Sequence, residues 1–109
     1  MGDLRVRNYR EVCALWPRGE IPRGFHEPVR SEVPALLLAG ELDPAIPPFR
    51  SEEIVRQLPN SRLILVPGSS HSPVNECTAG LIRDFLATGS VSKLDVSCVA
   101  ATHRSPFVI

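Results

Sequence analysis

An aspartate and a histidine each follow a short apolar run, and their types match two of the three groups of a hydrolytic triad. Asp43 stands in the segment Gly40–Pro44, and His71 stands in the later segment Gly68–Ser72. A histidine can take a proton from a hydroxyl nucleophile and return it to a leaving group, because its unperturbed pKa is about 6.5. A carboxylate bonded to the other ring nitrogen orients the imidazole. We therefore predict that Asp43 is the catalytic acid and His71 is the general base.

The third member of the triad, a serine nucleophile, has no counterpart in this sequence. In the α/β-hydrolase fold this serine lies in a G-x-S-x-G turn, and no two glycines of the chain have that spacing. The serines beside the histidine, Ser69, Ser70 and Ser72, are expected to shape its loop rather than to attack a substrate. Since the chain order of that fold is Ser, then Asp or Glu, then His, we expect the C-terminal part of a longer enzyme, inactive by itself.

Two apolar runs are predicted to be the strands that position these residues. Val33–Ala39 and Leu63–Val66 show no alternation of polar and apolar residues, which is typical of strands covered on both faces of a parallel sheet. Gly40 ends the first run and Pro67 ends the second. Glu41, which follows the first strand, is expected to be a solvated carboxylate rather than a part of the site.

Three helices are predicted around these strands. Apolar residues at helical spacing indicate an amphipathic helix over residues 3–16. A short crossover helix is expected to begin with Ser51 as its N-cap, and a last helix is expected to have Thr78 as its N-cap and Gly89 as its C-terminal stop. The inward side chains of the last helix are predicted to be Leu81, Ile82, Phe85 and Leu86.

The predicted order of strand, helix, strand and helix defines an α/β fold with parallel strands. Two strands and two helices cannot cover every face and edge of such a sheet, so the sheet is expected to be incomplete. The open edge would then pair either with a missing N-terminal part of the hydrolase or with a second copy of this chain.

The charge and apolar content of the chain exclude several classes of partner. Twelve basic residues balance twelve acidic ones, so nothing favours binding to nucleic acid or to an anionic membrane surface. The longest apolar run, Val33–Ala39, is far shorter than the ~20 residues that a membrane helix needs. The opening residues lack the pattern of a signal peptide. No cofactor or metal is expected.

The three cysteines, Cys13, Cys77 and Cys98, leave their pairing open. They show no C-x-x-C spacing, which argues against a structural zinc site. One disulfide and one free thiol remain possible. A bond between Cys77 and Cys98 would stabilise the fold by about 3 kcal/mol in the chain-entropy model, and it would imply an oxidising compartment.

Several stretches together resemble the C-terminal region of the TAP-like α/β-hydrolases, the tripeptidyl-aminopeptidase-like and proline-iminopeptidase-like serine peptidases. The matching stretches are Cys13–Pro17, Val33–Pro44, Leu58–Arg62, Gly68–Ser72 and Asp84–Leu86. The step G-x-x-D-P followed by G-x-x-H carries most of the resemblance. A departure is Ile46, which stands where the family commonly has threonine.

The resemblance implies a β-α-β-α portion of an α/β-hydrolase, with Asp43 and His71 as its catalytic residues and a peptide or ester as the substrate of the intact enzyme. It also implies that residues 1–30 derive from a lid and that residues 31–109 form the C-terminal hydrolase segment. Cys77 and Cys98 resemble a pair often seen in exported members.

The alternative hypothesis is a non-catalytic folding or interaction module that pairs its open sheet edge with a partner.

Overall fold

Two parallel strands form the centre of the protein. The computed structural model describes residues 2–104 and residue 106. Strand β1, Ala35–Gly40, pairs along its whole length with strand β2, Ser61–Val66. The register places Gly40 opposite Val66, so the segments that leave the two strands start side by side at one edge of the sheet.

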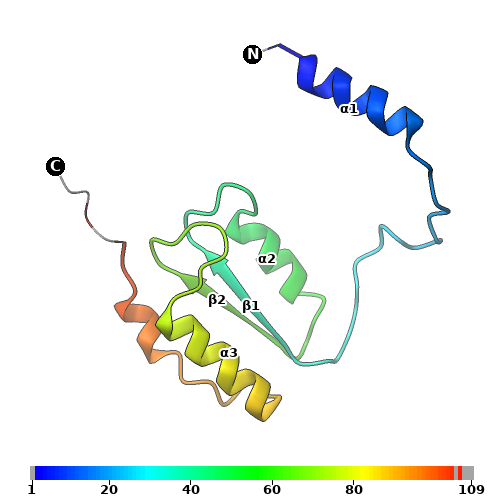
Figure 1. Ribbon diagram of the computed structural model, residues 1–109. Coiled ribbons are helices and arrows are strands. Elements are labelled where there is room, and N and C mark those ends of the chain that lie inside the picture. The colour runs from blue at the N-terminus through cyan, green and yellow to red at the C-terminus, as the bar shows by residue number, and fades with distance from the viewer. Residues whose placement is uncertain (1, 105, 107–109) are drawn as a thin grey trace.

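Helices lie on both sides of this sheet. Helix α1, Leu4–Leu15, precedes the strands, α2, Pro48–Val55, connects them, and α3, Glu76–Thr88, follows β2. A short 3₁₀ helix, η1, Ser97–Ala101, comes last. Figure 1 shows α2 on one side of the strands and α3 on the other. The predicted α/β class, the parallel strands and the open, incomplete sheet are confirmed, since the described residues form a sheet of two strands.

The two helices that flank the sheet begin earlier than the sequence predicted. α2 starts at Pro48, whose ring presets a helical φ at the first position, and Ser51 lies buried inside the helix instead of capping it. The cap of α3 is Asn75, whose side chain accepts a hydrogen bond from the Thr78 N–H at 3.0 Å. Thr78 is therefore the second partner of a capping box rather than the cap. Gly89 ends α3 in the left-handed region, as predicted.

The core lies between the sheet and α3. Its buried side chains come from β2, from α3 and from the segment after α3, and they are Ile64, Val66, Leu81 and Leu94. Leu36 and Leu38 of β1 pack against them. The Arg62 guanidinium donates hydrogen bonds to the carbonyls of Val91 and Leu94 at 3.2 and 3.0 Å, which fastens the segment after α3 to β2. Leu86, which was predicted to face inward, is 75% exposed.

We expect Leu81→Ala to lower the free energy of unfolding by about 2–5 kcal/mol, because it removes a buried side chain and leaves a cavity. Leu86→Ala, in the same helix, is the matched control and should change stability by less than about 0.5 kcal/mol. Urea unfolding followed by circular dichroism measures both variants. Equal effects of the two substitutions would contradict this description of the core.

A disulfide joins α3 to the 3₁₀ helix that follows it. Cys77 lies in the first turn of α3, and it is bonded to Cys98 of η1 across a sequence separation of 21 residues. Cys13 carries a free thiol and is exposed. Of the pairings that the sequence left open, the structure therefore has one disulfide between Cys77 and Cys98.

The N-terminal residues have no buried face in this chain. α1 forms where the apolar spacing predicted a helix, but none of its residues is buried. Tyr9, Val12 and Trp16, which share the apolar side, are 58%, 56% and 72% exposed. No helix in the described part of the chain has the length and apolar character needed to cross a membrane.

Candidate active site

Asp43 is held by hydrogen bonds within the loop that follows β1. Its Oδ1 accepts hydrogen bonds from the backbone N–H groups of Ala45 and Ile46, at 2.8 and 3.0 Å. Such a turn is the usual use of an aspartate before proline, and here it leaves Oδ2 free for another partner. The residue is only 8% exposed, so the carboxylate is both buried and fixed by its own loop.

His71 meets this carboxylate from the loop that follows β2. Its Nδ1 lies 2.8 Å from Asp43 Oδ2. Because an ionised carboxylate can only accept, Nδ1 carries the proton and Nε2 carries the lone pair of a neutral ring. The His71 side chain is 54% exposed, against 6% for Asp43. The predicted contact between the two side chains is thus present, with the carboxylate buried and the imidazole accessible.

The pKa of Asp43 is lowered from its ordinary value. The largest cause is the hydrogen bond from the Ile46 N–H, which stabilises the ionised form; burial opposes it, and hydrogen bonds from His71 and the Ala45 N–H add to the lowering. The net effect favours a charged carboxylate, which is the form that can orient the imidazole.

The lowered pKa of Asp43 predicts how the stability of the fold changes in acid. A carboxyl whose pKa is lower in the folded state contributes stability above its unfolded pKa, and this contribution is lost as the pH falls through the folded pKa. We therefore expect the stability difference between the natural chain and Asp43→Asn to shrink steadily below about pH 4. The comparison with Asp43→Asn is needed because the pKa of Asp95 is lowered too, by hydrogen bonds from the Ser97 N–H and hydroxyl. Asp95 therefore adds its own pH dependence to the stability of both proteins. Urea unfolding from pH 7 to pH 2 measures it, and a constant difference contradicts the prediction.

Main-chain and side-chain bonds tie the two site loops together. The N–H of Leu42 donates to the Ser69 carbonyl at 2.8 Å, and the N–H of Glu41 donates to the Val66 carbonyl at 3.1 Å. The Glu41 carboxylate accepts the Gly68 N–H at 2.8 Å. The prediction of a merely solvated Glu41 missed this contact, because its partner belongs to a distant loop. The one local signal for this contact was Gly68, which follows the second strand and indicates a turn there.

A small cavity adjoins the Asp43–His71 pair. It has a volume of about 170 Å³ and is lined by Leu38, Ala39, Asp43, Ile46, Ser51, His71, Ser72 and Pro73. Pockets for small molecules usually measure roughly 300–1,000 Å³. The cavity is therefore smaller than a typical pocket for a small molecule.

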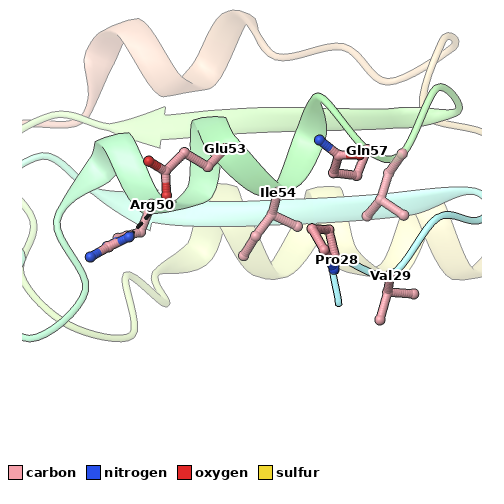
Figure 2. Close-up of a pocket in the computed structure, with 7 residues that line it drawn as sticks. Pro28, Val29, Arg50, Glu53, Ile54 and Gln57 are labelled. Carbon is pink, nitrogen blue, oxygen red and sulfur yellow. Dashed lines mark hydrogen bonds and ion pairs between the residues drawn. The ribbon is translucent and has the colours of Figure 1, made fainter. Parts of the chain in front are cut away.

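A larger apolar pocket lies elsewhere, along α2. It measures about 600 Å³, and none of its lining residues lines the cavity of the site. Figure 2 shows Ile54 of α2 beside Pro28 of the preceding connection, with the Arg50–Glu53 ion pair, 3.1 Å long, at the rim. Nothing in this pocket joins it to the Asp43–His71 pair.

The ring of His71 has Asp43 as its side-chain hydrogen-bond partner within the described part of the chain. Ser69, Ser70 and Ser72 form no hydrogen bond with this ring among the residues that the structure describes. Ser72 adopts a left-handed φ of 57°, which places it in the turn beside the histidine. No group of three or more potential metal ligands occurs among the described residues.

A parallel β-α-β-α unit whose loops bring a buried aspartate to an accessible histidine is a portion of an α/β-hydrolase fold. The chain belongs to the TAP-like protein family of these hydrolases, whose family model matches residues 1–98. No curated protein and no solved structure matches the chain. The resemblance inferred from the sequence is confirmed as a hydrolase-family C-terminal region.

Proposed function

We propose that Asp43 and His71 are the acid and the general base of a serine hydrolase that cleaves peptides or esters, with a nucleophile supplied by another hydrolase segment. The observation that carries the proposal is the 2.8 Å contact between His71 Nδ1 and Asp43 Oδ2, beside a ring that is half exposed. Since Nδ1–H is donated to the carboxylate, Nε2 is the nitrogen available to a serine hydroxyl.

In the proposed reaction His71 transfers a proton twice, and Asp43 keeps its charge. As the serine oxygen attacks the carbonyl carbon, its proton moves to His71 Nε2, and the imidazolium then returns that proton to the departing amine or alcohol. Asp43 stays ionised throughout and stabilises the imidazolium. Its lowered pKa supports this role, because the carboxylate then resists protonation at neutral pH.

A fluorophosphonate probe, which reacts with activated serines, tests the proposal. The chain alone should not be labelled, because it has no G-x-S-x-G turn. The chain joined to a hydrolase segment encoded in frame with such a turn should be labelled, and His71→Ala should abolish the labelling. Labelling of the isolated chain, or labelling of the joined protein that survives His71→Ala, would overturn the assignment.

We propose that the partner of the open sheet is this nucleophile-bearing N-terminal part. Support comes from the two-stranded sheet and from the exposed aromatic side chains of the N-terminal connection, such as Trp16 and Phe25, which are 72% and 68% exposed. The alternative is a non-catalytic module that pairs its edge with a second copy.

Sedimentation separates these two assemblies. A stoichiometric complex with the N-terminal hydrolase part supports the proposed partner, whereas a dimer of the chain that excludes this part supports the module. A chain that stays monomeric at all concentrations and ignores the N-terminal part contradicts both.

A further inference from the structure

His71 depends on its loop for its position more than Asp43 does. Asp43 is fixed by two hydrogen bonds within its own turn and is almost fully buried. The His71 side chain is 54% exposed, and its hydrogen bond to Asp43 is the one that orients it. The backbone between β2 and His71 therefore decides whether the ring can reach the carboxylate.

That backbone is tied to the aspartate loop at three points. Two ties are main-chain bonds, from Glu41 N–H to the Val66 carbonyl and from Leu42 N–H to the Ser69 carbonyl. The third is the bond from the Gly68 N–H to Glu41 Oε2, at 2.8 Å. It is the only one of the three that a side chain makes, and it engages the turn in which Gly68 adopts a φ of +63°.

We propose that Glu41 is a positioning residue, which holds the histidine loop so that His71 presents Nδ1–H to Asp43 and keeps Nε2 for the nucleophile. This inference rests on the proposed function for its catalytic meaning, but the geometry on which it depends belongs to this chain alone. The Glu41 carboxylate bonds to the Gly68 N–H rather than to the imidazole, so it acts through the loop.

Two conservative substitutions separate hydrogen bonding from charge. Glu41→Gln keeps the reach of the side chain and an oxygen that can accept the Gly68 N–H, but it loses the charge. Glu41→Asp keeps the charge, but it is one methylene shorter. A positioning role predicts that the glutamine variant behaves like the natural chain and that the aspartate variant behaves like Glu41→Ala.

The measurement is the tautomer of His71 in the full chain labelled with ¹⁵N-histidine, at a pH where the ring is neutral. In the natural chain and in Glu41→Gln, Nδ1 should carry the proton. In Glu41→Asp and Glu41→Ala, the ratio of the Nδ1–H to the Nε2–H form should fall roughly fivefold, as expected for the loss of one hydrogen bond. The signals of His26 and His103 should stay unchanged in all variants. Glu52→Ala, which removes an exposed carboxylate from α2, controls for the change in charge.

The possible results are distinct. An unchanged tautomer in Glu41→Asp, or a tautomer lost in Glu41→Gln and kept in Glu41→Asp, overturns the positioning role. The serine-hydrolase function fails separately if the joined protein is not labelled by fluorophosphonate. A tautomer that follows the predicted pattern, with kcat of the joined enzyme falling in Glu41→Asp at unchanged KM, supports both.

Discussion

Asp43→Asn should lower kcat of the joined hydrolase by about 10⁴-fold, the size of effect seen when an amide replaces the triad carboxylate. The physical reason is the hydrogen bond between Asp43 Oδ2 and His71 Nδ1. An amide nitrogen at this place would donate rather than accept. Nδ1 would then hold the lone pair and Nε2 would carry the proton, so Nε2 could no longer act as the base. Steady-state hydrolysis of a chromogenic ester measures kcat.

Asp84→Asn is the matched control for this substitution. Asp84 lies exposed on α3 and pairs with its neighbour Arg83 at 3.3 Å, so the same chemical change there should leave kcat unaltered. A loss of activity in both variants points to a general effect of charge, and full activity in Asp43→Asn removes the acid from the proposed triad.

Gly40→Ala should lower the free energy of unfolding by about 1–3 kcal/mol and separate Asp43 from His71. A Cβ at position 40 would overlap the Ser70 carbonyl oxygen and would lie 2.6 Å from the Ser69 carbonyl oxygen. These atoms belong to the backbone, which cannot swing away as a flexible side chain does. The two site loops would have to move apart, so the His71 tautomer should change together with stability.

Gly80→Ala provides a control of the opposite sign. The nearest atom to a Cβ at position 80 is Arg83 Nη2 at 3.8 Å, and the position lies inside α3, where alanine is favoured over glycine by about 0.5–1 kcal/mol. Urea unfolding should therefore show that one Gly→Ala change destabilises the protein and that the other stabilises it. Tolerance of Gly40→Ala would contradict the close approach of the loops.

The elements of the fold were predictable because their signals are local. Continuous apolar runs before Gly40 and Pro67 indicated two strands of a parallel sheet, and the left-handed Gly89 ended the last helix as expected. The first residues of the helices were harder to predict. Pro48 and Asn75 begin their helices a few residues before Ser51 and Thr78, since a proline at the first position and a capping box competed with the simpler caps.

The sequence by itself determined the strand–loop segments, the residue types that they carry and the absence of a nucleophile turn in this chain, because each depends on neighbouring residues. Only the tertiary structure decided that Asp43 touches His71, that Cys77 bonds Cys98 and that Glu41 binds the histidine loop. These contacts join residues far apart in the chain. The contacts of Asp43 and Glu41 arise from the parallel register of β1 and β2, which brings both loops to the same edge of the sheet, whereas the disulfide joins α3 to η1.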